Sequence, residues 1–355
     1  MSNADHNLVK IGITMGDING VGPEVIIKTF LDNRMMQVCT PVVYGSSKVA
    51  SFYRKQMNTG EFTFNIIKDA SQAASKNPNM INVWDEETKV DVGEATELGG
   101  KKALQSLQAT VADLKAGKID AMVTAPINKN NIQSNEFKFP GHTEYLAEYF
   151  ETKKYLMLLV NGNLRVGTAT GHIPLNEVSK AISKEKIIEK AEILNQSLIK
   201  DFGVRKPKIA ILGLNPHAGD NGLLGKEEIE IISPAVQQLK EKGILAFGPY
   251  PADGFFGSGA FEKYDGVLAM YHDQGLAPFK AMSFSSGVNF TAGLPIVRTS
   301  PDHGTAYDIA GKNLASENSF REAIYLACDI VKNRKLYSEA GENPLPFGTY
   351  KKERG

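Results

Sequence analysis

Three histidines each follow a short run of strand-forming residues and could together bind a metal ion. His172 stands in GTATGHIPL, His217 in ILGLNPHAGD and His272 in VLAMYHDQG. Ligands of open α/β sheets bind at the edge where the carboxyl ends of the strands lie. Three imidazoles without thiolates suit zinc, cobalt or a similar divalent ion and leave one coordination position for water or substrate. The spacing therefore predicts a catalytic metal site rather than a structural one.

The simpler alternative is that these are three unrelated loop histidines, each bonded to nearby backbone. One histidine alone is weak evidence for a metal site. The shared placement of all three after strands makes a metal site as well supported as three unrelated loop histidines. Asp253 in PADGFF and Asp273 beside His272 could orient an imidazole or move a proton. Either aspartate could equally cap a turn or a helix.

A second group of residues could hold an anion. In FPGHTEYLAEYF, His142 and Thr143 follow a Pro-Gly turn, and Thr143 is placed to cap a helix whose free N–H groups attract phosphate or carboxylate. Lys280 ends HDQGLAPFK, Asn289 lies in VNFTAG and Arg298 ends LPIVR. Cations beside a metal indicate an anionic substrate. A plain capped helix and solvated surface charges are the alternatives.

The segment SPDHGTAYDIAGK, residues 300–312, could bind a nucleotide, although the sequence has neither G-x-G-x-x-G after its first strand nor a P-loop. It is a compact loop with His303, two glycines and Asp308. A carboxylate there can accept hydrogen bonds from a ribose 2′-hydroxyl and would repel a 2′-phosphate, which favours NAD over NADP. On spacing alone, a surface loop capped by Asp302 fits as well.

Strand and helix patterns alternate along the chain and must position these residues. Strands are expected at residues 9–14, 41–44, 62–67, 80–84, 119–124, 155–160, 164–170, 208–212, 245–247, 266–270 and 295–297. Helices are expected at 23–32, from about 46, at 94–115, 184–201 and 320–331. Asn161-Gly162-Asn163 is typical of a hairpin turn. The pattern predicts a mostly parallel but mixed sheet covered by helices.

Composition excludes several classes of protein. The 355 residues suggest about two domains, and 40 basic against 40 acidic residues argue against a nucleic-acid partner. No apolar run approaches a membrane span, and the N-terminus lacks a signal-peptide pattern. Two distant cysteines, Cys39 and Cys328, indicate a reducing compartment. We therefore expect a cytoplasmic α/β enzyme without a membrane partner.

Several long motifs resemble a known family. HGTAYDIAGK is similar to the adenine-binding loop of the isocitrate and isopropylmalate dehydrogenase superfamily. The motifs ITMGDINGVGPEV, TAPINK, FPGHTEYLAE, ATGHIPL, GLNPHAGDNGLLGKEE, YHDQGLAPFK and VNFTAGLPIVRTSPDHGTAYDIAGK resemble the 4-hydroxythreonine-4-phosphate dehydrogenases of pyridoxal phosphate biosynthesis. The resemblance covers nearly the whole chain.

The resemblance implies two α/β/α domains with an active site in the cleft between them. We expect a cofactor-side unit of residues 1–130 plus 300–355 and a metal, substrate and dimerisation unit of residues 131–299. It also implies a homodimer whose active site lies at the subunit interface, with one divalent metal (zinc, cobalt or magnesium) shared by both chains. The implied metal ligands are His172, His217 and His272.

The resemblance further implies a phosphorylated small-molecule substrate and an NAD cofactor, with NADP less favoured. The implied substrate contacts are His142, Thr143, Lys280, Asn289 and Arg298, and the implied cofactor contacts are His303, Gly304, Thr305, Ala306, Asp308 and Gly311. Lys280 and Asp253 are our candidates for proton transfer. The metal would acidify the substrate's hydroxyl while hydride leaves, and the β-keto acid would then lose carbon dioxide to give 3-amino-2-oxopropyl phosphate.

Two other activities are compatible with the sequence. A dehydrogenase of 4-phosphothreonate or 4-phosphoerythronate would keep the metal ligands and cofactor loop but recognise no amine. A phosphate-binding acyltransferase of related architecture would need neither metal nor nicotinamide. Measuring turnover of the candidate substrates side by side distinguishes the first alternative from a 4-hydroxythreonine-4-phosphate dehydrogenase. Growth of the reduced-nicotinamide absorbance band distinguishes a dehydrogenase from the acyltransferase.

Overall fold

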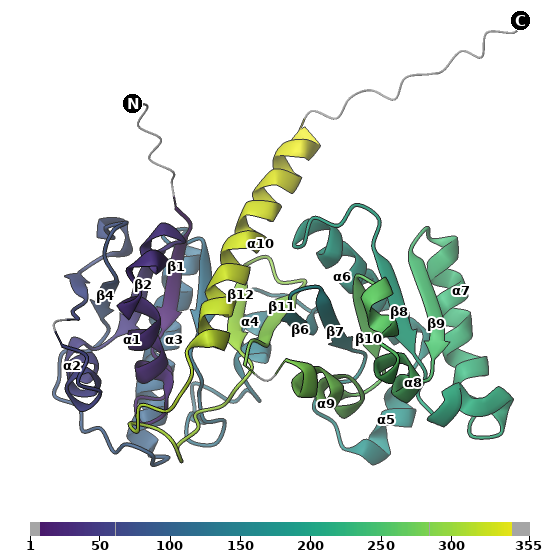
Figure 1. Ribbon diagram of the computed structural model, residues 1–355, viewed down its shortest axis with the longest axis horizontal. Helices are drawn as coiled ribbons and strands as arrows, with labels where there is room; N and C mark the ends of the chain where they lie inside the picture. Colours follow the sequence, from purple (N-terminus) through teal and green to yellow (C-terminus); the bar gives the residue numbers. More distant parts are fainter. Residues whose placement is uncertain (1–7, 61, 284, 343–355) are drawn as a thin grey trace, which may run out of the picture.

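The computed structural model describes residues 8–60, 62–283 and 285–342. Twelve strands form one continuous sheet in the order β3-β4-β2-β1-β5-β12-β11-β6-β7-β10-β8-β9 (Figure 1). Their bounds are β1 Lys10–Thr14, β2 Thr40–Gly45, β3 Asn65–Ile67, β4 Asn79–Asn82, β5 Ala121–Thr124, β6 Leu156–Asn161, β7 Leu164–Thr168, β8 Lys208–Leu212, β9 Leu245–Tyr250, β10 Gly266–Ala269, β11 Val288–Ala292 and β12 Arg298–Pro301.

Most strand pairs are parallel, and the exceptions lie together in the middle of the sheet. The pairs β6–β7, β6–β11 and β11–β12 are antiparallel, whereas β12 is parallel to β5. The expected hairpin at Asn161-Gly162-Asn163 is the β6–β7 turn. The prediction of a mostly parallel, mixed sheet is confirmed.

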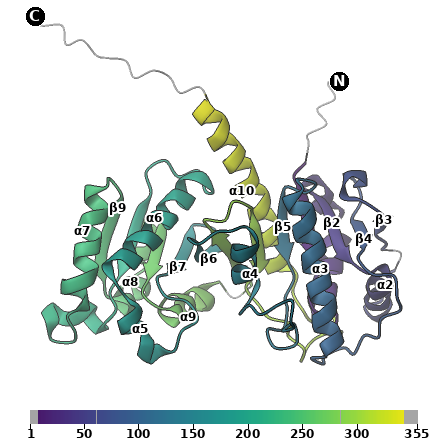
Figure 2. The same cartoon turned by 180° about the vertical axis from the view of Figure 1, so that it is seen from behind.

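Helices cover both faces of the sheet, as βα alternation requires. They are α1 Gly22–Leu31, α2 Ser47–Gln56, α3 Glu97–Lys115, α4 His142–Tyr149, α5 Leu175–Ala181, α6 Lys184–Lys200, α7 Ser233–Glu241, α8 Ala252–Gly257, α9 His272–Met282 and α10 Asn318–Glu342. Apolar residues of α1, α2, α6, α7 and α10 share one buried cluster. Residues of α3 and α4 form a second cluster on the opposite face, seen in front in Figure 2.

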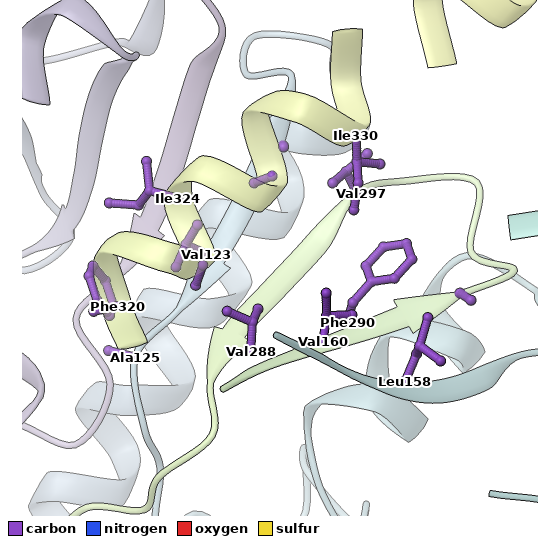
Figure 3. Packing of buried hydrophobic residues seen from close by; sticks show 14 of the residues in the cluster. Val123, Ala125, Leu158, Val160, Val288, Phe290, Val297, Phe320, Ile324 and Ile330 are labelled. Carbon is purple, nitrogen blue, oxygen red and sulfur yellow. The ribbon is translucent and has the colours of Figure 1, made fainter. Parts of the chain in front are cut away.

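Helix α10 packs across the centre of the sheet, where the chain returns from the second half to the first. Phe320 and Ile324 are fully buried and lie over Val123 of β5, while Val288 and Phe290 of β11 continue the same cluster (Figure 3). Burying a side chain of this size stabilises the fold by about 1.5–3 kcal/mol. The core thus joins β5, β11 and β12 beneath a single helix.

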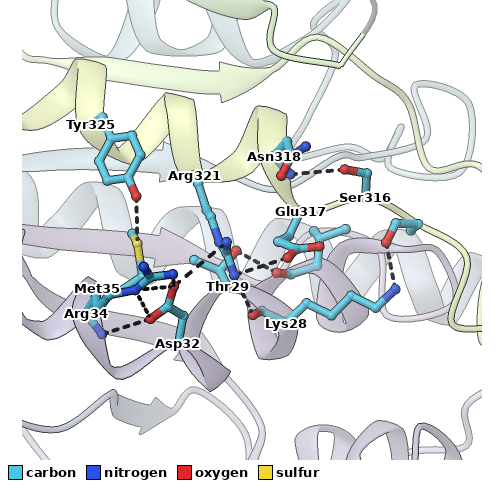
Figure 4. A network of polar contacts seen from close by, with 12 residues as sticks. Lys28, Thr29, Asp32, Arg34, Met35, Ser316, Glu317, Asn318, Arg321 and Tyr325 are labelled. Carbon is cyan, nitrogen blue, oxygen red and sulfur yellow. Dashed lines mark hydrogen bonds and ion pairs between the residues drawn. The ribbon is translucent and has the colours of Figure 1, made fainter.

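Polar contacts between the end of α1 and the start of α10 add little to this packing. Arg321 pairs with Glu317 at 3.1 Å and lies 4.0 Å from Asp32 (Figure 4). Ion pairs near the surface contribute about 0–1 kcal/mol. Apolar burial therefore fixes α10, and with it the strands that carry the functional residues described below.

Two expectations about local structure are wrong. The strand expected at 295–297 begins instead at Arg298, because residues 294–297 form a bend after β11 and Pro295 has no N–H to donate to a neighbouring strand. Thr143 does not cap α4: the helix begins at His142, Gly141 is its N-cap, and no side chain caps it. The hydroxyl of Thr143 lies 3.3 Å from that of Thr291 instead.

The predicted domain division at residues 130 and 300 stays a prediction, and residues 1–7 and 343–355 of its first unit lie outside the described residues. Across the described part of the chain, no helix is both long and apolar enough to cross a membrane.

Candidate active site

The three predicted metal-ligand histidines follow three neighbouring parallel strands. His172 comes after β7, His272 directly after β10, and His217 after β8. β10 pairs in parallel with both β7 and β8, so the carboxyl ends of all three strands meet at one edge of the sheet. Adjacent strands thus bring to one edge of the sheet residues that are up to a hundred positions apart in the sequence.

A cavity of about 700 Å³ opens at this edge, between the end of β5, the start of α4 and helix α9. Nine of the predicted site residues line it: His142, Thr143, His172, His272, Lys280, Asn289, Arg298, His303 and Gly304. The other predicted residues do not line it, namely His217, Asp253, Thr305, Ala306, Asp308 and Gly311. All five predicted substrate contacts therefore face one space.

A buried guanidinium forms one wall of the cavity. Arg298, only 3% exposed, donates to the Thr124 hydroxyl through Nε at 3.0 Å and Nη2 at 2.7 Å. Its Nη2 also donates to Nδ1 of His142 at 3.3 Å. Burial lowers the pKa of Arg298 to about 10, which still leaves it charged at neutral pH. A charge held by neutral partners in a cavity wall is suited to binding an anion.

Three buried polar atoms in the cavity wall have no hydrogen-bond partner: Nε2 of His142, Oδ1 of Asn289 and Nε2 of His303. Burial, followed by the charges of Arg298 and Lys129, lowers the pKa of His142 well below its ordinary value. Burial also lowers the pKa of His303. Since buried polar groups are normally paired, three unpaired groups around one cavity indicate a polar ligand.

Lys280 and Asp302 form an ion pair in the cavity wall, with 3.1 Å between Nζ and Oδ1. Lys280 is half-exposed on α9, whereas Asp302 is mostly buried after β12. Burial raises the pKa of Asp302 despite the nearby lysine. The pair places a lysine ammonium beside the predicted anion-binding residues.

Two of the three predicted metal ligands are neighbours. The ring centroids of His172 and His272 are 5.4 Å apart, and Nδ1 of His272 lies 2.6 Å from Oδ1 of Asp273. Burial lowers the pKa of His172 and so favours the neutral form that binds metals. The donor types fit a divalent ion. Among the described residues of one chain, however, no three His, Cys, Asp or Glu side chains gather closely enough to hold one.

His217 and Asp253 lie beyond the cavity, on segments that contact each other. His217 is in a turn after β8, and Asp253 is exposed in the first turn of α8. The turn contacts α8 directly. Within one chain, neither side chain joins the paired histidines.

The predicted cofactor loop packs against the turn between β1 and α1. The N–H of Val21 donates to the carbonyl of Thr305 at 3.0 Å, and the Tyr307 hydroxyl donates to buried Asp17 at 2.7 Å. The N–H of Gly311 donates to Glu24 at 3.0 Å. Ala306 has a positive φ of 43°, and Asp308 is exposed. The loop is thus anchored on both sides while Asp308 faces solvent.

Several residues that line the cavity are not predicted from the sequence: Lys129, Glu144, Lys186, Lys190 and, as a cavity residue, Asp302. Lys129 stands in TAPINK, a motif that contributed to the resemblance but received no role. Lys186 and Lys190 are spaced four residues apart on α6 and so share one helix face. The four-residue spacing of these lysines is the sequence feature that could have indicated a shared binding face, but the same spacing also occurs on ordinary solvated helices.

Comparison with known proteins identifies the family of this chain. Residues 37–327 match the family described as Pyridoxal phosphate biosynthetic protein PdxA. A 4-hydroxythreonine-4-phosphate dehydrogenase of Bacteroides thetaiotaomicron is 53% identical, covering 98% of this chain and 96% of that protein. The 4-hydroxythreonine-4-phosphate dehydrogenase structure from Klebsiella pneumoniae is 36% identical with a TM-score of 0.79, covering 91% of this chain and 99% of that one.

A protein of Oceanobacillus iheyensis provisionally named a D-threonate 4-phosphate dehydrogenase is 38% identical, covering 91% of this chain and 98% of that protein. The match to the family spans most of the sequence, and the relatives are similar over nearly their full lengths. The chain belongs to the PdxA family.

Proposed function

We propose that this protein is an NAD-dependent dehydrogenase that oxidises the 3-hydroxyl of 4-hydroxythreonine 4-phosphate. The alcohol loses a hydride and a proton, and the resulting β-keto acid loses carbon dioxide to give 3-amino-2-oxopropyl phosphate. The observation that carries the proposal is the cavity in which the buried cation Arg298 and three unpartnered polar atoms surround one space beside the paired histidines. The family membership supports the same conclusion.

The substrate's anionic groups would be bound by His142, Thr143, Lys280, Asn289 and Arg298. Arg298 is already oriented by Thr124, so little conformational freedom is lost when it binds an anion. Nε2 of His142 and Oδ1 of Asn289 would gain the partners that they lack. The terminal phosphate and the carboxylate would thus bind to groups that are fixed before the substrate arrives.

We propose that one divalent ion (zinc, cobalt or magnesium) is held by His172, His217 and His272, with ligands from two copies of the chain. A bound divalent ion would lower the pKa of the substrate's hydroxyl and stabilise negative charge on its oxygen. Asp273 contacts Nδ1 of His272 and would orient that ring so that Nε2 is free to bind.

A homodimer would explain why one chain leaves the ligand set incomplete. Large apolar side chains are exposed around both histidine segments: Ile173, Leu175, Leu223, Leu224 and Ile229. Exposed apolar groups gathered beside a site are typical of a surface that a partner covers. The second copy would bring His217, and with it the neighbouring Asp253, to the cavity.

Lys280 and Asp253 are the proposed proton-transfer groups. Lys280 lies in the cavity wall and is held by Asp302, which fixes the position of its ammonium. Asp253 would reach the site only from the second copy. NAD would bind along His303, Gly304, Thr305, Ala306, Asp308 and Gly311 and accept the hydride, with exposed Asp308 favouring the unphosphorylated ribose.

The test is a steady-state assay of the purified protein with NAD and a divalent ion. Three substrates are compared: 4-hydroxythreonine 4-phosphate, 4-phosphothreonate and 4-phosphoerythronate. We expect growth of the NADH absorbance with the first at a higher kcat/KM than with either acid. The named relative from Oceanobacillus iheyensis makes 4-phosphothreonate the second candidate, and a higher kcat/KM for that compound would overturn the proposed substrate.

Cys39 and Cys328 are free and buried, which fits our proposal of a cytoplasmic protein.

A further inference from the structure

The turn that carries His217 has an unusual backbone. Five successive residues, His217–Asn221, have positive φ values of 54°, 51°, 81°, 42° and 55°. Only the third of them is glycine. A left-handed conformation costs roughly 1–2 kcal/mol for each residue with a side chain. Contacts elsewhere must therefore hold this turn in place.

Glu228, which is 3% exposed, supplies such contacts. Its Oε1 accepts hydrogen bonds from the backbone N–H groups of Leu214 and Asn215, each at 2.7 Å. Its Oε2 accepts from the side-chain amide of Asn215 at 3.0 Å. No described Lys, Arg or His pairs with this carboxylate, so neutral donors of the His217 segment satisfy it.

The turn also wraps closely around the carboxylate. A Cβ on Gly219 would lie 2.6 Å from Oε2 of Glu228, and a Cβ on Gly213 would lie 3.1 Å from Oε1. A side chain at position 219 would collide with the carboxylate. Glycine at both positions lets the backbone pass on either side of Glu228.

Gln274 joins this segment to the one that carries His272. Its Nε2 donates to the carbonyl of Gly213 at 2.6 Å, and its Oε1 accepts from the N–H of Met270 at 2.7 Å. Met270 lies just before His272, and Gly213 lies just before the His217 turn. One side chain therefore fixes the end of β8 against the end of β10.

We infer that Glu228 and Gln274 are positioning residues that hold the His217 turn in one conformation at the ends of β8 and β10, so that the turn presents His217 to the site of the second copy. Neither side chain lines the cavity. Glu228 fixes the shape of the turn, and Gln274 fixes its place against the neighbouring strand. The inference rests on the proposed metal-binding role of His217. Residues that orient metal ligands commonly change metal affinity by about 10- to 100-fold when substituted.

The experiment titrates Co²⁺ into the metal-free full-length protein and records its visible absorbance. We expect Glu228→Gln and Gln274→Ala each to weaken Co²⁺ binding about 10- to 100-fold and to shift the absorbance bands. Glu230→Gln is the matched control, because Glu230 is exposed on the same turn of helix. It should stay within about twofold of the native protein. Thermal unfolding of each variant confirms that the fold is retained.

Native Co²⁺ affinity and spectrum in both variants, while His217→Ala loses Co²⁺, would overturn this inference and leave the proposed function intact. If His217→Ala binds Co²⁺ as the native protein does, the metal-ligand assignment itself is wrong, and the inference fails with it.

Discussion

Arg298 and His142 form a buried pair in which the guanidinium donates to Nδ1 of the imidazole at 3.3 Å. The imidazole is neutral, because its pKa is lowered well below the ordinary value. A neutral ring whose Nδ1 accepts must carry its proton on Nε2. Nε2 has no partner in the cavity wall. The pair thus presents two donors, one charged and one neutral, to an anionic ligand.

Replacing Arg298 with lysine should remove this arrangement while keeping the charge. A lysine cannot contact Thr124 and His142 at once, because its ammonium lacks the planar fork of a guanidinium. A hydrogen bond to a charged group contributes about 1.5–3 kcal/mol, so we expect kcat/KM to fall about 10- to 100-fold. Steady-state kinetics measure the change. Arg34→Lys, at the exposed ion pair with Asp32, is the control, and an equal loss there would contradict the assignment.

The low pKa of His142 predicts how stability depends on pH. Below its ordinary pKa of 6.5, the unfolded chain binds a proton at this residue and the folded chain does not. Above that pH, His142 therefore does not reduce the free energy of unfolding. As the pH falls below it, the free energy of unfolding decreases. In His142→Asn, the loss should be shallower by up to about 1.4 kcal/mol per pH unit. Urea unfolding of both proteins at pH 5 and pH 7 measures the difference, and parallel losses would refute the prediction.

Local patterns predicted most of the strands, because most of them are short apolar runs. The strand at Arg298–Pro301 was misplaced, since its residues Arg-Thr-Ser-Pro show no apolar pattern. They are buried because α10 packs on one face of this strand, while Thr124 and His142 enclose Arg298 on the cavity side, which is a tertiary effect. Val288–Ala292 is a strand that the sequence does not predict, although Asn289 within it is a predicted site residue.

The grouping of the substrate residues could not come from spacing alone. Lys280, Asn289 and Arg298 lie on α9, β11 and β12, and only the strand order brings these elements to one cavity. Long motifs shared with a known family identified them. The partners of Arg298, such as Thr124, come from strands far away in the sequence and were not predicted. Which cavity residues act in chemistry stays a prediction.

The exposed carboxylate of Asp308 predicts the choice between the two nicotinamide cofactors. Asp308→Arg should shift the ratio of kcat/KM values toward NADP, because a guanidinium attracts the 2′-phosphate that a carboxylate repels. Asp308→Asn removes the repulsion without adding attraction and should give an intermediate ratio. Rates with both cofactors at fixed substrate measure the effect. An unchanged ratio in both variants would contradict the loop assignment.

Mixing two inactive variants tests whether two copies of the chain share the metal ion. We expect His172→Ala and His217→Ala each to abolish turnover while keeping the fold, because each removes a proposed ligand. If His172 and His217 of one site come from different copies, a mixed dimer contains one site with both histidines intact. An equal mixture, refolded together, should then recover about a quarter of the native activity. If both histidines come from the same copy, every site in the mixture lacks one of them and no activity returns. Activity that persists in His217→Ala after treatment with a chelator would instead show that this histidine is not a ligand.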